Sequence, residues 1–193
     1  ICISDPLRKE AKEAIQALHA CGISKVVMMT GDSRRTAEAV AREVGVDQFY
    51  AEVLPEDKAN FVRQEKAAGR KVIMIGDGVN DTPALSEADV GIAINTGAAI
   101  AREIADVTIA SEDLFELVTL RKISQALMGR IQRNYRFIVG FNLMLIVLGV
   151  TGVIQPTTSA LLHNASTLGI SLDSMTDLLD KDKEKALPET ESA

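Results

Sequence analysis

A run of 18 residues without a charged side chain, residues 137–154, constrains the fold of this chain more than any other feature. A helix of that length is just long enough to cross the hydrocarbon core of a membrane. A long helical pattern that opens with Ser111-Glu112-Asp113 leads into it and carries five basic residues: Arg121, Lys122, Arg130, Arg133 and Arg136. Because cytoplasmic flanks of membrane helices are rich in Lys and Arg, this side is expected to face the cytoplasm.

A second apolar segment, residues 158–179, follows the tight polar connection Gln155-Pro156-Thr157. The two segments predict a membrane hairpin, and the charged residues after it predict a short cytoplasmic tail. We therefore expect a multi-pass protein of the plasma membrane with four parts. These are a cytoplasmic domain at 1–112, a connecting helix at 113–136, two transmembrane helices at 137–179 and a tail at 180–193.

The first 112 residues alternate short apolar strands with helical patterns, which is typical of an α/β fold with a doubly wound parallel sheet. The strands are predicted at residues 25–29, 49–51, 72–75, 90–94 and 107–109. The helices are predicted at residues 6–20, 34–44, 55–69 and 98–105, and Gly22, Gly45 and Gly69 stand where helices would stop. The net charge of −6 over 193 residues gives no general basic surface for nucleic acid.

The third of these strands runs directly into the turn Gly76-Asp77-Gly78-Val79-Asn80-Asp81. A buried strand that ends this way places its polar turn at the carboxyl edge of the sheet, where open α/β sheets bind ligands. Asp77 and Asp81 lie four residues apart and offer the oxygen ligands that Mg²⁺ prefers. The alternative interpretation is an acidic turn that only caps the next helix.

Three further pieces are expected to hold a phosphoryl group at the same edge. Thr30-Gly31-Asp32 also follows a strand, Lys58 offers a positive charge, and Asn80 offers an amide donor. Each has a plainer interpretation, respectively a polar turn, a solvated helix lysine and ordinary turn chemistry. Together they resemble a phosphoryl-transfer site, in which positioning and electrostatics provide most of the catalysis. The sequence has no P-loop motif.

The motifs Thr30-Gly31-Asp32 and Gly76-Asp77-Gly78-Val79-Asn80-Asp81-Thr82-Pro83 resemble the hinge signatures of P-type ATPases, within the haloacid-dehalogenase-like phosphotransferases. The resemblance covers nearly the whole chain, from Asp5-Pro6-Leu7-Arg8 to Leu179. It implies that Asp77 binds Mg²⁺ with support from Asp81. It also implies that Thr30, Gly31, Lys58 and Asn80 surround the phosphoryl group while Asp32 shapes the loop.

Two departures from the family pattern limit what this chain is expected to do alone. The Asp-Lys-Thr-Gly-Thr segment with the phosphorylated aspartate is not in the sequence, and neither is the nucleotide-binding domain that follows it in the family. The chain thus looks like the C-terminal part of a pump whose ATP is bound mainly elsewhere. By itself it is expected not to hydrolyse ATP.

Only about two spans follow the hinge motif, which narrows the resemblance to heavy-metal-translocating pumps. Ionisable and amide groups inside a span are costly, which makes His163, Asn164 and Asn142 candidates for holding the transported ion. Imidazole suits borderline metals such as Zn²⁺, Ni²⁺ and Co²⁺, and also Cu. The alternative is that His163 is an interfacial residue near the outer surface. The expected partners are a divalent or soft heavy-metal ion, the lipid bilayer and the rest of the pump.

A second hypothesis is a membrane-anchored regulatory or interaction module that keeps the Mg²⁺ turn without catalysis. The coding region upstream of Ile1 distinguishes the two, because a pump requires the phosphorylated segment there. The sequence leaves the identity of the metal open, since His163-Asn164 departs from the pairs typical of copper and zinc/cadmium pumps.

Overall fold

The structure is a computed structural model that describes residues 10–76, 79–94, 103–110 and 113–178. The chain divides into two compact units, Ile1–Thr119 and Leu120–Ala193. The first contains the strands and most of the helices, and the second contains the greater part of a long helix and the one that follows it. This division lies close to the predicted junction between the α/β domain and the connecting helix.

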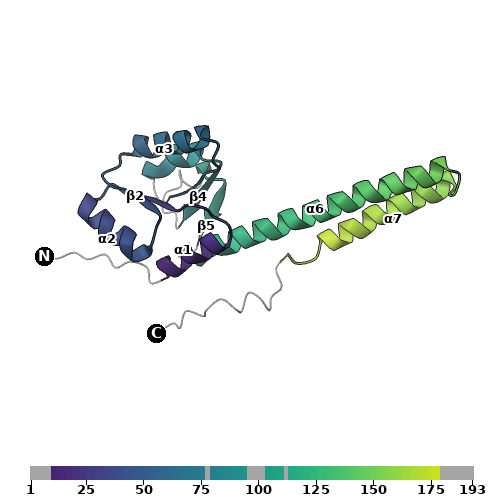
Figure 1. Ribbon diagram of the computed structural model, residues 1–193, viewed down its shortest axis with the longest axis horizontal. Helices are drawn as coiled ribbons and strands as arrows, with labels where there is room; N and C mark the ends of the chain where they lie inside the picture. The colour runs from purple at the N-terminus through teal and green to yellow at the C-terminus, as the bar shows by residue number, and fades with distance from the viewer. Residues whose placement is uncertain (1–9, 77–78, 95–102, 111–112, 179–193) are drawn as a thin grey trace. The chain divides into compact units, whose positions relative to one another are not determined.

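All five described strands pair in parallel, which confirms the predicted α/β fold (Figure 1). The strands are β1 (Val27–Met29), β2 (Gln48–Tyr50), β3 (Ile73–Gly76), β4 (Val90–Ile94) and β5 (Val107–Ile109). They form two sheets, β1-β2 and β3-β4-β5, because within the described residues β1 and β3 do not pair with each other.

Three described helices of the first unit lie at the predicted places: α1 (Ala11–Ala20), α2 (Arg34–Val44) and α3 (Pro55–Ala67). After β3 come the 3-10 turn η1 (Val79–Asp81) and the short helix α4 (Thr82–Glu87). Gly45 ends α2 in the left-handed conformation, with φ of 81°, which a residue without Cβ adopts at little cost. The predicted helix at residues 98–105 lies mostly outside the described residues, as do residues 6–9 of the first one.

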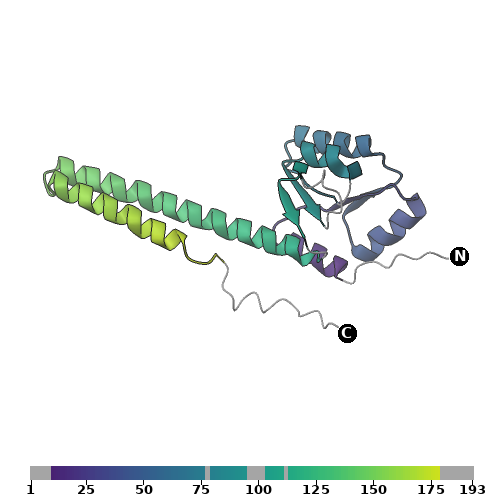
Figure 2. The ribbon, with the colours of Figure 1, turned by 180° about the vertical axis from the view of Figure 1, so that it is seen from behind.

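Helix α3 packs against both sheets and so joins them. Its Ala59 and Val62 lie in the buried core with Met74 of β3 and with Ala84 and Leu85 of α4. Met29 of β1 packs against the same core, and the ring of Phe61 lies 5.0 Å from that of Tyr50 in β2. Figure 2 shows α3 and α4 side by side over the strands. The carboxyl ends of β1 and β3 are thus built on one core although they share no backbone hydrogen bonds.

Asp89, just before β4, ties the start of β3 in place. Its carboxylate accepts the Val72 backbone N–H at 3.0 Å and the Lys71 ammonium at 3.0 Å. Both hydrogen bonds lower the pKa of the Asp89 carboxyl, and the one from the Val72 backbone has the larger effect. A group whose pKa is lowered by folding stabilises the fold above its unfolded pKa of about 3.9, and this stabilisation is lost as the pH falls through the folded pKa.

We therefore expect the stability of Asp89→Asn to fall less steeply below about pH 4 than that of the unchanged chain, because the variant has no carboxylate to protonate at this position. The measurement is the unfolding temperature of the chain by circular dichroism at a series of pH values. Glu43→Gln, at an exposed position on α2, is the matched control. An Asp89→Asn curve parallel to that of the unchanged chain would contradict the assignment.

The second unit is an antiparallel hairpin of α6 (Phe115–Val150), most of which lies in it, and α7 (Pro156–Ser174). The two helices run side by side in both ribbon views (Figures 1 and 2). Among the described helices, α6 alone is long and apolar enough to cross a membrane by length and composition. The predicted connecting helix and first span form this one continuous helix, which ends at Val150 and not at Ile154. The second predicted span corresponds to α7, which carries hydroxyl, amide and imidazole groups and does not meet this criterion.

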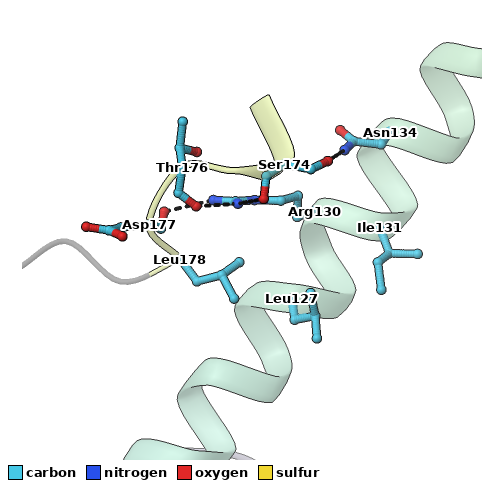
Figure 3. A pocket seen from close by; sticks show the side chains of 8 residues that line it. All are labelled: Leu127, Arg130, Ile131, Asn134, Ser174, Thr176, Asp177 and Leu178. Atoms are coloured by element: carbon cyan, nitrogen blue, oxygen red, sulfur yellow. Dashed lines mark hydrogen bonds between the residues drawn. The ribbon is translucent and has the colours of Figure 1, made fainter. Parts of the chain in front are cut away.

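Polar contacts fasten the end of α7 to α6 (Figure 3). The Arg130 guanidinium donates to the backbone carbonyls of Ser174, Thr176 and Asp177 at 2.6 to 3.3 Å. Asn134 donates to the Ser174 hydroxyl at 3.2 Å. Since the last carbonyls of a helix have no partner within it, Arg130 caps α7 from the neighbouring helix. A cavity of about 500 Å³ lies beside this contact, lined in part by Leu127 and Ile131.

Candidate phosphoryl-transfer and metal-transport sites

The turn after β1 is held by its own side chains. The Thr30 hydroxyl donates to the Asp32 carboxylate at 2.9 Å and accepts the Asp32 backbone N–H at 3.1 Å. The Thr30 backbone N–H bonds to Tyr50 O at 3.0 Å, which extends the β1-β2 pairing by one residue. Gly31 lies between them and is exposed. Asp32 is thus bonded to Thr30 through both its carboxylate and its backbone N–H.

Lys58 and Asp81 meet at the end of β3. The Lys58 Nζ atom, from the first turn of α3, donates to Asp81 Oδ1 at 2.7 Å. The two side chains are only 16% and 12% exposed. Asp81 is also the one buried charged residue in the described part of the chain. A buried carboxylate needs a partner, and a lysine 23 residues away in sequence supplies it.

The Asp81 side chain folds back over Gly76, the last residue of β3. A Cβ atom at Gly76 would lie 2.6 Å from Asp81 Cβ and 2.8 Å from Asp81 Oδ2, closer than side chains pack. Gly76, which has no Cβ, therefore makes room for the Asp81 side chain. Next to Asp81, the Thr82 hydroxyl is buried and has no hydrogen-bond partner within the part of the chain that the structure describes.

Asp77, the predicted Mg²⁺ ligand, lies outside the described residues. No group of three His, Cys, Asp or Glu side chains suited to a metal occurs among those that are described. Asn80 is exposed on η1. The described residues that follow nevertheless offer donors that suit a hard cation, because Asp81 Oδ2 and the Thr82 hydroxyl, which has no partner among the described residues, are oxygen atoms. The structure brings Lys58 and Asp81 together, and among the described residues neither side chain bonds to Thr30.

In the hairpin, two of the three predicted transport residues are in contact. His163 Nδ1 of α7 lies 2.8 Å from Asn142 Oδ1 of α6. Asn164 is exposed and has no hydrogen bond to either of them in the described hairpin. Asp173 forms an ion pair with Arg133 at 2.7 Å, which gives its charge a structural partner.

Residues 1–89 match the family model of the haloacid dehalogenase-like hydrolases. The copper-transporting ATPase 2 of Rhizobium meliloti is 46% identical over 162 residues, which cover 84% of this chain and 19% of that protein. The manganese-exporting P-type ATPase of Mycobacterium leprae is 41% identical over 175 residues, which cover 90% of this chain and 24% of that protein. This chain is homologous to part of P-type ATPases that are named for copper transport and manganese export.

The structural comparison agrees with that family. A zinc-transporting PIB-type ATPase in its E2·Pi state superposes with a TM-score of 0.82 and 33% identity, over 89% of this chain and 28% of that one. The chain spans about a fifth to a quarter of the length of the curated P-type ATPases that it matches. Proteins of this ATPase family use Mg²⁺ and ATP in general and are membrane proteins.

Sequence reasoning missed two features of these sites. The Thr82 hydroxyl gave no signal beyond its position next to Asp81 and Pro83. The Arg130 cap on α7 was read only as part of a basic flank, because its partners are backbone carbonyls that no sequence pattern marks.

Proposed function

We propose that this chain is the part of an ATP-driven heavy-metal transporter that supplies the Mg²⁺-holding and phosphoryl-holding residues and two membrane spans. The buried contact between Lys58 and Asp81 carries the proposal. It gathers a cation and a carboxylate beside Gly76, which is the last residue of β3 and the first of the Gly-Asp-Gly motif. The 46% identity to a copper-transporting ATPase supports the same interpretation.

In this proposal Asp77 holds Mg²⁺, and Asp81 supports the site from the Gly76 side. When bound, Mg²⁺ neutralises charge that develops on the phosphoryl oxygens. Thr30, Gly31 and Asn80 face the phosphoryl group with hydroxyl, backbone and amide donors, while Asp32 keeps the Thr30 hydroxyl in place. Lys58 adds a positive charge that Asp81 orients. ATP and the phosphorylated aspartate come from parts of the pump outside this sequence.

The transported ion is a divalent or soft heavy metal held in the hairpin. His163, Asn142 and Asn164 are the proposed contacts, with His163 as the leading ligand because imidazole suits such metals. Relatives named for copper, manganese and zinc export or transport leave more than one metal open. The polar character of α7 supports this role, since a helix rich in polar groups in a membrane faces a pathway or a neighbouring helix.

We further propose a plasma-membrane location with both spans in the bilayer. Most large apolar side chains of α6 beyond Ile123 are exposed in this chain, including Leu143, Ile146 and Val147. Lipid and the other spans of the pump would cover them. The basic residues before the first span support a cytoplasmic α/β domain and tail.

The test is ATP hydrolysis by the full-length pump with Zn²⁺, Co²⁺, Ni²⁺, Mn²⁺, Fe²⁺ and Cu⁺. We expect one metal to stimulate hydrolysis and His163→Ala to lower that stimulation at least about tenfold, because an imidazole ligand is lost. Phosphorylation by inorganic phosphate should survive, since it needs only the α/β site.

Asn164→Ala, at the exposed neighbouring position, is the matched variant for this experiment. Stimulation that is unchanged in His163→Ala and lost in Asn164→Ala would move the transport site to the adjacent face of α7. A full-length protein that no metal stimulates would instead favour the membrane-anchored regulatory module.

A further inference from the structure

The contact between His163 and Asn142 fixes where the ring carries its proton. The two atoms are His163 Nδ1 and the Asn142 carbonyl oxygen Oδ1, at 2.8 Å. An amide carbonyl oxygen only accepts hydrogen bonds, so the hydrogen must lie on Nδ1. In a neutral imidazole this leaves the lone pair on Nε2, which is the form in which His binds a metal.

The backbone at His163 is held as well. The hydroxyls of Ser166 and Thr167, one turn onward, both donate to the His163 carbonyl at 2.8 and 3.0 Å. Asn142 is half-buried on α6, three residues before Leu145, which is buried at 3% exposure. The acceptor therefore stands on a packed part of the hairpin, and the ring it contacts stands on an anchored turn.

We propose that Asn142 is a positioning residue: it holds His163 in the tautomer that presents Nε2 to the transported metal. This differs from the ligand role expected for Asn142, because its Oδ1 atom faces the ring N–H and not a cation. The inference rests on the proposed transport function, since it assumes that His163 binds the metal. Partners of this kind orient metal-binding histidines and raise their basicity in other metal sites.

The test uses the full-length pump in nanodiscs with ¹⁵N-labelled histidine, and compares Asn142→Leu, Asn142→Asp and Asn134→Leu. Leu removes the acceptor, whereas Asp keeps an acceptor oxygen at the same place. Asn134→Leu is the matched control, because Asn134 also bonds α7 from α6, through Ser174 and away from His163. Two quantities are measured: the ring ¹⁵N shifts of His163 without metal, assigned by their loss in His163→Ala, and the metal concentration for half-maximal ATP hydrolysis.

We expect the unchanged pump, Asn142→Asp and Asn134→Leu to show the proton on Nδ1. Asn142→Leu should show a mixture of tautomers and need about 10- to 100-fold more metal, the range found for partners of metal-binding histidines. Ring shifts in Asn142→Leu equal to those of the unchanged pump would overturn the inference. An equal loss of metal affinity in Asn134→Leu would also overturn it, because loosening of the hairpin would then explain the effect.

Failure of the proposed function has a different signature. In that case His163→Ala leaves metal stimulation unchanged, whatever tautomer His163 adopts, and the inference falls with it. When His163→Ala abolishes stimulation and Asn142→Leu matches the unchanged pump in both measurements, only the role of Asn142 is wrong.

Discussion

Replacing Lys58 with methionine is expected to destabilise the α/β unit by about 3 kcal/mol and to abolish ATP hydrolysis by the full-length pump. Asp81 would remain buried, at 12% exposure, with no opposite charge. An unpaired charge in a protein interior is costly, whereas removing both members of such a pair is often nearly neutral. The double variant Lys58→Met with Asp81→Asn is therefore expected to recover most of the stability and none of the activity.

Hydrogen exchange of the segment from α3 to β4 measures the stability change directly. A loss of about 3 kcal/mol corresponds to local exchange roughly 100-fold faster. Lys66→Met is the control, because Lys66 lies on the same helix but is exposed. Recovery of activity in the double variant would show that the pair serves folding alone, and normal stability in the single variant would show that Asp81 is not buried as a charge.

Gly76→Ala is expected to have the second largest effect, a destabilisation of about 2 kcal/mol together with loss of phosphorylation. The added Cβ would lie 2.6 Å from Asp81 Cβ, so either the end of β3 or the Asp81 side chain must move. Movement of Asp81 separates it from Lys58, and the support for the Gly-Asp-Gly turn is lost with it.

Gly31→Ala distinguishes an effect on packing from an effect on the approach of a ligand to the backbone. A Cβ at Gly31 meets only Val53 O, at 3.9 Å, so stability should change by no more than about 0.5 kcal/mol. Loss of phosphorylation without loss of stability in this variant would place the phosphoryl group against the Gly31 backbone. The measurements are thermal unfolding of the chain and phosphorylation of the full-length pump by inorganic phosphate. A stable, active Gly76→Ala variant would contradict the packing described above.

Local patterns predicted the elements of the fold well. The strand at residues 90–94 and the helix at 34–44 have the predicted bounds, because an apolar run of strand-forming residues and a helical pattern closed by Gly45 are local signals. Sequence could not show that β1 and β3 do not pair within the described residues, since strand pairing depends on how distant segments pack. It also could not show that α3 would contact both sheets through Ala59, Val62 and Phe61.

The sequence predicted which residues belong to the candidate sites, but not which of them contact each other. Lys58 and Asp81 were expected at one site, but nothing local indicated a direct bond between side chains 23 positions apart. Asn142 and His163 were separate candidates for the metal, and their contact depends on the register of the hairpin, which the turn at 151–155 sets. Asp77 and its Mg²⁺ remain a prediction.

The division of the strands into two sheets also bears on how this chain behaves outside its parent protein. Within the described residues, β1 pairs only with β2, and β3 pairs only with β4, so each has one side whose backbone groups bond to no strand. Unpaired strand sides recruit other extended segments, including those of a second molecule. Ile73 and Ile75 on β3 are 43% and 39% exposed, which adds apolar surface beside that side. A separately expressed α/β unit should therefore self-associate, and a strand supplied by the remainder of the pump should suppress that tendency.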